Sequence, residues 1–337
     1  MRLAFVLLSL LIFHSVGGYG QQTVTMNKYI EADSIAALYQ GHSLDDIRAL
    51  SLKLTQSLTT DHDKFRAIFK WVCDNVSNDA SNYLRNRNYR HKYRSDSIKL
   101  ASWNKDFSQH VIKKLITSKT TVCTGYAVLI KQLAFYAGIE CEVVNGYGRT
   151  AQSALYDEGM LPNHSWNAVK LSGNWYLCDA TWASGFIDPN NGQFIKDFTE
   201  AYFFTSPALF VRNHYPLDSQ WQLTSETITL QQFYDEPLIY RDALENYILP
   251  YSPNTFKLHR VKGQNLVIVF AAPSYPHHLE LELVLGGRIK NYQPKITVLG
   301  NGLYQIDHTL TMIGHWTAHV KQNDAYLFSY DVLVVKR

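Results

Sequence analysis

The sequence predicts an α+β fold in which a helix that begins at a cysteine packs on an antiparallel sheet, followed by a C-terminal β-sandwich. Three observations predict this fold. Apolar residues recur at helical spacing directly after Cys123, and two strand-like runs joined by Ser172-Gly173 follow. Beyond residue 250, short strand-like runs alternate with turn signals. Because 337 residues exceed what one hydrophobic core usually organises, we expect two domains, at 21–247 and 248–337.

The composition is that of a folded chain without a strong electrostatic field. Hydrophobic residues make up 46% of the sequence, and the formal net charge is +3. The apolar share argues against a disordered chain. The nearly balanced charge gives no reason to expect nucleic acid as a partner.

Residues 1–20 are predicted to be a signal peptide for secretion. Arg2 supplies the positive start, residues 3–13 form an apolar run, and Gly20 suits cleavage. The run is short for a bilayer span, and no second long apolar stretch follows. We therefore expect a secreted or periplasmic protein with no transmembrane segment after cleavage of the signal.

Four cysteines bear on both redox state and chemistry. They are Cys73, Cys123, Cys141 and Cys178. Export permits disulfides, but a catalytic Cys123 has to stay free, so at most one bridge is expected among the other three. The spacing does not choose the pair. No Cys-x-x-Cys pattern is present, which disfavours a zinc ribbon, and we expect no metal and no cofactor.

The first well-defined helix is predicted to begin near Thr60 and to bury one face. That face consists of positions three and four residues apart, namely Phe65, Ile68, Phe69, Val72 and Val76. An earlier helix start is indicated at residues 43–46. The polar stretch 82–96 is expected to be a solvated loop. The alternative is a basic rim that attracts acidic substrate or cell-envelope material.

A second helix is predicted from Cys123 to about residue 137, with Gly138 as its stop. A strand is expected at 139–147, and residues 150–163 are expected to form a loop beside the site. The start of this helix matters because a thiol at a helix N-terminus loses its proton more readily.

Two strands, from about His164 to Leu171 and from Asn174 to Trp182, are predicted to form a hairpin. The turn sets a register in which Leu171 pairs with Asn174. Because side chains alternate along a strand, Asp179 is then the diagonal neighbour of His164 on the same face. Diagonal Cβ atoms lie about 7–8 Å apart or somewhat less, which permits a His–Asp hydrogen bond.

Cys123, His164 and Asp179 together have the chemistry of a thiol catalytic triad. The Cys123 thiolate would attack an amide carbonyl, and His164 would accept the thiol proton and later protonate the leaving amine. Asp179 would orient the imidazole and stabilise its charged form. The backbone N–H of Cys123 is a candidate oxyanion donor. Trp103 is a candidate second donor, although a core role is favoured for it.

Aromatic residues near the triad in sequence are candidates for a substrate groove: Trp103, Tyr126, Trp166 and Trp182. Core packing is the alternative, and it is favoured for the tryptophans. The triad itself leaves the reaction open. Water would resolve the acyl-enzyme to give a peptidase or amidase, and a lysine amine would give a cross-linker.

The C-terminal region is predicted to be a small immunoglobulin-like β-sandwich. Its expected strands are 266–270, 279–285, 295–299, 304–310, 316–321 and 328–335. Turn signals separate them, such as Gly286-Gly287 and Asn323-Asp324. Upstream, residues 202–204 are expected to add a strand to the first sheet.

The chain resembles the transglutaminase-like superfamily, whose fold is related to that of papain-type cysteine proteases. The resemblance rests on the blocks VCTGYA at 122–127 with AGI at 137–139, HSWNAV at 164–169 and GNWYLCDATW at 173–182. The helix at 64–72 resembles the family's leading helix. The stretches YFFTSP at 202–207, HYP at 214–216 and WQL at 221–223 are similar to the branch that contains the kyphoscoliosis peptidase and a yeast cytokinesis protein.

This resemblance covers about residues 60–225 and implies that Cys123, His164 and Asp179 are the catalytic residues. Thr121 stands where the family commonly has glycine, which is expected to alter the approach to the nucleophile. No clustered acidic calcium site is evident, which disfavours a calcium-dependent transglutaminase. The zinc-binding cysteine pairs of related deglycosylating enzymes are absent from the sequence.

The function expected from these observations is an exported thiol enzyme that acts on protein or peptide amide bonds, by hydrolysis rather than cross-linking. Two alternatives stay open. One is a catalytically inactive scaffold that uses its groove for binding, and the other is a protein-glutamine gamma-glutamyltransferase. The C-terminal domain is expected to bind substrate, a partner or the cell envelope.

Overall fold

The computed structural model describes residues 28–153, 160–188 and 191–337. The predicted signal peptide lies outside the described residues, as does part of the loop expected at 150–163. Within the described ranges, no helix has both the length and the apolar character needed to cross a membrane.

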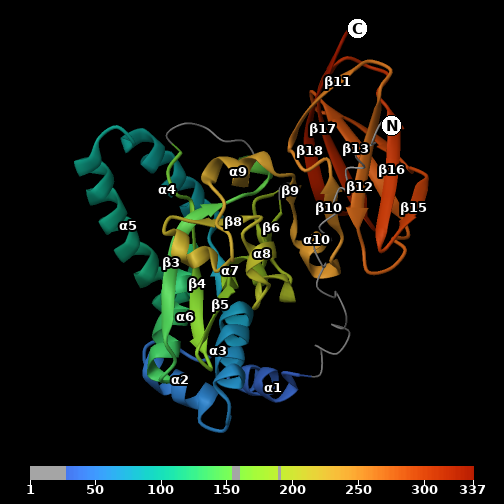
Figure 1. Ribbon diagram of the computed structural model, residues 1–337. Coiled ribbons are helices and arrows are strands. Elements are labelled where there is room, and N and C mark those ends of the chain that lie inside the picture. The colour runs from blue at the N-terminus through green and yellow to red at the C-terminus, as the bar shows by residue number, and fades with distance from the viewer. Residues whose placement is uncertain (1–27, 154–159, 189–190) are drawn as a thin grey trace, which may run out of the picture.

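The N-terminal part is helical, and its first helices form the base of the molecule in Figure 1. They are α1 (Ile30–Leu38), α2 (Ile47–Thr55) and α3 (Asp61–Asn75). Asp46 and Thr60 cap α2 and α3 by accepting backbone N–H groups of the first turn. The predicted apolar face of α3 is fully buried. Both predicted helix starts are therefore confirmed.

The basic stretch 82–96 is helical, so the prediction of a loop there was wrong. Helix α4 (Ala80–Tyr93) covers residues 82–93, and a short turn then leads into helix α5 (Ser97–Ser118); both helices project on the left of Figure 1. Asp79 caps α4 and Asp96 caps α5. The apolar pattern missed α4 because the helix buries only Asn82 and keeps a polar surface nearly all round.

Helix α6 (Cys123–Tyr136) packs on a four-stranded antiparallel sheet with the order β5-β4-β3-β8. The strands are β3 (Cys141–Gly148), β4 (His164–Leu171), β5 (Asn174–Cys178) and β8 (His214–Pro216). The predicted pairing of Leu171 with Asn174 is confirmed. A short parallel pair, β1 (Ser77–Asn78) with β2 (Thr120–Thr121), leads into α6.

Two strand predictions near the site need correction. The second hairpin strand ends at Cys178, and Asp179 caps the short helix α7 (Ala180–Ala183). Asp and Thr favour a helix cap over a continuing strand, which explains the early end. Residues 202–204 form no strand of the sheet, because a 3₁₀ turn precedes Phe203, which makes a single bridge to Cys178.

Small elements connect this sheet to the C-terminal region. They are β6 (Gly185–Ile187), β7 (Phe194–Lys196), α8 (Pro207–Phe210), α9 (Leu230–Asp235), β9 (Leu238–Ile239) and α10 (Arg241–Asn246). Strand β9 pairs with β18 of the C-terminal region. The predicted boundary at 247–248 therefore falls after the chain has already joined the C-terminal sheets.

The C-terminal region contains two further sheets, at the upper right of Figure 1. The first has the order β10 (Leu249–Ser252), β12 (Asn265–Ala271), β16 (Leu303–Thr309) and β15 (Ile296–Gly300). The second has the order β11 (Lys257–Val261), β18 (Ala325–Val335), β17 (Gly314–Gln322), β13 (Leu279–Leu285) and β14 (Arg288–Tyr292). All six predicted strands are present. The sequence pattern missed β10, β11 and β14, and the mostly exposed β14 lacks the alternation that reveals a half-buried strand.

Candidate active site

Cys123 is the first residue of α6 and is partly exposed. The Val122 carbonyl accepts the N–H groups of Gly125 and Tyr126, which closes the first turn. The earlier N–H groups of a helix have no partner within it and carry partial positive charge. The thiol therefore lies at the end of a helix that favours its anionic form.

Thr121 faces the inside of the molecule rather than the approach to Cys123. It is 0% exposed, and its hydroxyl donates to the Val111 carbonyl at 3.3 Å. A Cβ added at Gly125 would lie 1.9 Å from the Thr121 Oγ1 atom, so only glycine fits there. The Thr121 side chain, which replaces the family's usual glycine, therefore occupies space that a side chain at position 125 would need. Gly125 leaves that space free.

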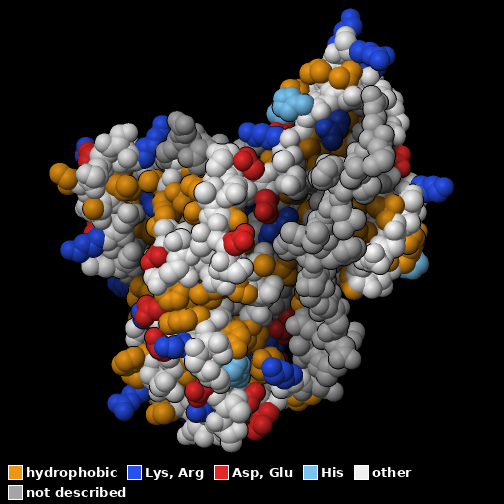
Figure 2. All heavy atoms as spheres, in the orientation of Figure 1, with side chains coloured by type: hydrophobic (Ala, Val, Ile, Leu, Met, Phe, Trp, Pro, Cys, Tyr) orange, Lys and Arg blue, Asp and Glu red, His pale blue; other side chains and the backbone are white. Residues whose placement is uncertain are grey.

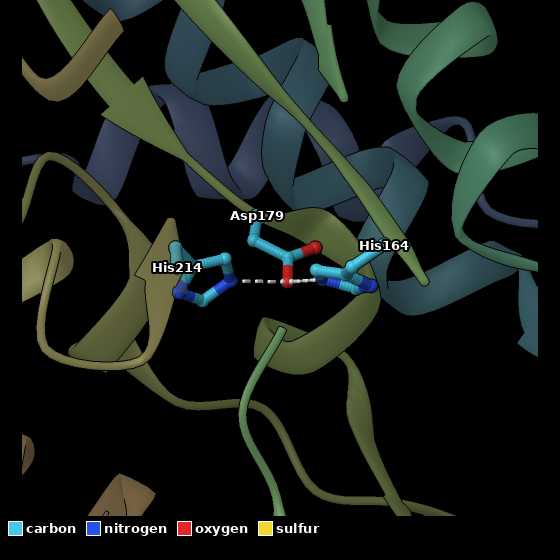
Figure 3. A group of neighbouring side chains, drawn as sticks. All are labelled: His164, Asp179 and His214. Atoms are coloured by element: carbon cyan, nitrogen blue, oxygen red, sulfur yellow. Dashed lines mark hydrogen bonds and ion pairs between the residues drawn. The ribbon is translucent and has the colours of Figure 1, made fainter. Parts of the chain in front are cut away.

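His164 and Asp179 meet as the hairpin geometry predicts, at the ends of β4 and β5. The His164 Nε2 and Asp179 Oδ2 atoms are 2.7 Å apart, and the Asp179 carboxylate is 1% exposed. Figure 3 shows this carboxylate between two imidazoles. Its other oxygen, Oδ1, accepts the Thr181 N–H at 2.8 Å and thereby caps α7. The cap fixes the carboxylate that holds His164.

His214 is the second imidazole on Asp179, and sequence reasoning assigned it no role. Its Nε2 atom lies 3.1 Å from Asp179 Oδ2, and its Nδ1 atom lies 2.6 Å from Asn213 Oδ1. His214 comes from β8, which pairs with β3 rather than with β4. The block HYP at 214–216 marked the position, but no spacing rule places β8 beside Asp179.

The charges of this cluster follow from its burial and its contacts. Burial lowers the pKa of His164, but the charge of Asp179, their hydrogen bond and the nearby Cys123 raise it overall to about 10. Burial raises the pKa of Asp179, but both imidazoles bring it below its usual range. Burial lowers the pKa of His214 to about 4, against the opposing effect of Asp179. At neutral pH, His164 is therefore the charged imidazole of the two, since burial disfavours the charged form of His214 more strongly.

Cys123 differs from the other cysteines in its acidity. Burial raises the pKa of Cys123, but the hydrogen bond to His164 and the positive charge of that imidazole outweigh burial, so the pKa is lowered. Burial raises the pKa of Cys141 to about 12 and also raises the pKa of Cys73 and Cys178. All four thiols are free. Cys123 is thus the thiol poised to ionise.

His164, Asp179 and His214 also place donor atoms within 4.8 Å of one another, so a metal ion has to be considered. The Asp179 oxygen lies 2.7 and 3.1 Å from the two imidazole nitrogens, which are hydrogen-bond distances. Ligands at about 2.0–2.1 Å from a tetrahedral zinc ion are separated from one another by about 3.3 Å. The observed geometry fits hydrogen bonding better than coordination.

The aromatic candidates for a groove have different positions. Trp166 and Tyr126 are 1% exposed and belong to the core, which is the alternative favoured for Trp166, so neither is available to line a groove. Trp182 is partly exposed and stacks on the His164 ring, with centroids 4.7 Å apart. Trp103 stacks on Tyr89 and donates its indole N–H to Asn86, so this N–H is not free to bind an oxyanion.

Comparisons with known proteins show which family the chain is similar to. Residues 48–180 match the model of the Transglutaminase-like superfamily, so the chain carries a transglutaminase-like domain. It is 30% identical over 218 residues to the kyphoscoliosis peptidase of Homo sapiens, covering 64% of this chain and 30% of that protein. It is 25% identical over 104 residues to cytokinesis protein 3 of Schizosaccharomyces pombe, covering 31% of this chain and 12% of that protein.

The predicted similarity to this branch of the superfamily is therefore confirmed. The chain spans less than a third of the length of the curated relatives it matches here. Among solved structures, a crystal structure of a TGase has 18% sequence identity and a TM-score of 0.28, and the match covers 53% of this chain and 38% of that one.

Proposed function

We propose that the chain is a thiol enzyme that hydrolyses amide bonds in proteins or peptides through an acyl-enzyme on Cys123. The observation that carries the proposal is the coupling of three groups. A partly exposed thiol of lowered pKa lies beside an imidazole of raised pKa, and a buried carboxylate holds that imidazole at 2.7 Å. Such coupling is what nucleophilic catalysis by cysteine requires.

The steps of the reaction follow from these positions. The Cys123 thiolate attacks the amide carbonyl carbon, and the charge on its oxygen develops near the backbone N–H of Cys123. When the C–N bond breaks, the His164 imidazolium gives its proton to the leaving amine. Water then attacks the thioester, His164 accepts a proton from it, and the carboxylic acid leaves as Cys123 is restored. Asp179 keeps the imidazole oriented throughout.

A substrate assay with two acceptors tests this proposal. Candidate proteins would be incubated with the full chain and with the Cys123→Ala variant, with and without a fluorescent primary amine, and analysed by mass spectrometry. We expect new termini or deamidated glutamines that depend on Cys123, with little incorporated amine. Efficient amine incorporation would instead indicate a transferase. The absence of any Cys123-dependent product would favour a binding scaffold.

The proposal also places the protein outside the cytoplasm and gives its C-terminal sheets a binding role. The proposal of export is supported by the positively charged start, the apolar run and the small residues of 1–20.

A sandwich of the two C-terminal sheets is supported by the contact between Phe270 of β12 and Phe328 of β18, whose ring centroids lie 6.2 Å apart across the two sheets. We propose an immunoglobulin-like sandwich that binds substrate or cell-envelope material. Cell fractionation with the mature N-terminus determined by mass spectrometry tests export.

A further inference from the structure

Arg90 of α4 is a cation at the candidate active site whose guanidinium is only partly used by the protein. Its Nη1 atom donates to the Pro162 carbonyl at 2.5 Å, two residues before His164. Its Nε atom is buried and has no hydrogen-bond partner. No ion pair joins Arg90 to an acidic side chain within the part of the chain that the structure describes.

Three other cations of α4 and its C-terminal cap have contacts of a different kind. Arg85 lies over the rings of Tyr89 and Trp103, and Lys92 lies over two tyrosine rings. Arg94 is exposed and donates to His91 at the end of the helix. Lys and Arg side chains are visible over α4 and α5 on the left of Figure 2. The helix contains no Asp or Glu, so nothing on it offsets these charges.

Arg90, Tyr83 and Cys123 influence one another electrostatically. Burial lowers the pKa of Arg90, and the Cys123, Tyr147 and Tyr83 side chains raise it in part. Burial raises the pKa of Tyr83, and Cys123 raises it further. The geometry that places the guanidinium near the site is the Pro162 contact, two residues before His164. Arg90 is also partly exposed, so part of its side chain is open to solvent next to the segment that leads into His164.

We propose that Arg90 binds a carboxylate of the substrate close to the scissile amide, and so makes the enzyme selective for acidic peptides. This inference rests on the function proposed above. A guanidinium presents a planar fork of N–H donors that matches a carboxylate. Within the described residues the guanidinium bonds the protein through Nη1 alone, which leaves further N–H groups of the fork for a carboxylate. The carboxylate can belong to an acidic side chain or to a chain terminus.

Two alkylating reagents of matched size test the charge recognition without a known substrate. Iodoacetate and iodoacetamide react with the Cys123 thiolate in the same way: a sulfur–carbon bond forms and iodide leaves. They differ in carrying a carboxylate or a neutral amide. The ratio of their rate constants at Cys123, divided by the same ratio for the urea-unfolded chain, isolates recognition of the charge from the reactivity of the thiol.

We expect this normalised ratio to be about tenfold above one in the folded chain, since a hydrogen bond to a charged group contributes on that order. Arg90→Gln should lower it several-fold, to the smaller preference that the charged His164 alone gives, while Arg94→Gln, the exposed control at the end of the same helix, should leave it unchanged. A folded wild-type ratio at or below one would overturn the proposal, and this comparison does not require any variant to fold. A ratio that survives in a folded Arg90→Gln would also overturn it, leaving Arg90 as an anchor for Pro162.

Failure of the proposed function gives a different result. In that case Cys123 reacts no faster with iodoacetamide in the folded chain than in the unfolded one.

If Cys123 does react faster with iodoacetamide in the folded chain, competition by peptides identifies the source of the carboxylate. Peptides with Glu or Gln beside the amide, each with a free or amidated C-terminus, would be compared for their protection of Cys123. The proposal predicts that one of the two carboxylates protects in wild type and loses its advantage in Arg90→Gln, and it is contradicted if neither does.

Discussion

Asp179 is the residue on which the candidate active site depends most. Its two oxygens accept from His164, His214 and the Thr181 backbone, so one carboxylate orients the imidazole, meets a second imidazole and caps a helix. It is 1% exposed, and its negative charge is stabilised by these donors rather than by water. A change at this residue should affect chemistry more than folding if the cap is kept.

Asp179→Asn is such a change, because an asparagine oxygen can still accept the Thr181 N–H. Without the carboxylate charge, the pKa of His164 should fall towards its ordinary value, and the thiolate of Cys123 should lose its charged partner. We expect amide turnover to fall by about 10³–10⁴. Steady-state kinetics, with circular dichroism to verify folding, measure this. Turnover within threefold of wild type would show that the carboxylate has no catalytic role.

The sequence predicts the triad at the residue scale because a two-residue turn and strand alternation decide which side chains meet. Cys123, His164 and Asp179 all lie within or beside one α6–hairpin unit. His214 and Arg90 reach the site from β8 and α4, which approach it through tertiary packing. Residue spacing within one segment does not show which distant strands and helices pack beside it, so His214 and Arg90 were found only in the structure.

At the scale of elements, β3 and β4 are positioned by a close approach at Gly148. A Cβ added there would lie 3.0 Å from the His164 Cβ and Cγ atoms and 3.0 Å from the Trp182 Cζ2 atom. Contacts this short force the neighbouring side chains to move. Strand β3 therefore needs a glycine at the point where it passes the imidazole.

We predict that Gly148→Ala lowers kcat about tenfold, because a small displacement of His164 spoils its alignment with Cys123. The cost in stability should be about 1–2 kcal/mol, as for other overpacked sites. Turnover and urea unfolding would be measured on the same preparation. Unchanged kcat would mean that the His164 ring is not held by this contact.

Helix α3 is tied to its neighbours by Arg66. This side chain is 2% exposed and forms bidentate contacts with Asp33 and with Glu200, all at 2.6–2.8 Å. It also lies over the Phe203 ring, 4.8 Å from its centroid. The arginine thus links α1, α3 and the segment that follows β7.

Arg66→Ala should lower the free energy of unfolding by about 3 kcal/mol, because it removes both the buried packing and the partner of two carboxylates. Lys64→Ala is the matched control on the same helix, since its pair with the exposed Asp61 should contribute less than about 1 kcal/mol. Urea unfolding measures both. Equal losses in the two variants would show that burial of Arg66 adds nothing.

Elements were predicted well where an apolar face is strong and poorly where it is weak. Helices α3 and α6 and the six C-terminal strands follow from periodicity because each buries a regular set of side chains. Helix α4 does not, and its Asp79 cap was the available signal. The Asp179 cap likewise marked the end of β5.

At the scale of the whole molecule, the transglutaminase-like and C-terminal parts are joined by more than a linker. Strand β9 pairs with β18, and the 1% exposed Arg149 at the end of β3 donates to the carbonyls of Phe233, Tyr234 and Glu236. Arg149 also lies over the Phe256 ring, 4.9 Å from its centroid. The domain boundary predicted at 247–248 came from a change in the sequence pattern, which contains no information on such long-range pairing.

Arg149→Met should therefore destabilise the protein by about 3 kcal/mol, since three carbonyls lose a charged donor while most of the packing volume stays. We also expect faster proteolysis within 230–260 than elsewhere, because the lost contacts hold that segment. Limited digestion with mass spectrometry, alongside urea unfolding, measures both effects. A cleavage pattern identical to that of wild type would argue against a connecting role for Arg149.

The central claim is that Cys123 is ionised by His164 in the folded protein, and the pH dependence of its alkylation tests this most directly. The rate of iodoacetamide labelling at Cys123, read by peptide mass spectrometry, would be followed from pH 5 to pH 10. A lowered thiol pKa means that the thiolate is present above that pKa and is lost as the pH falls through it. The midpoint should therefore lie below that of the unfolded chain, and His164→Ala should move it upward. Coincident midpoints in the folded chain, the variant and the unfolded chain would contradict the account.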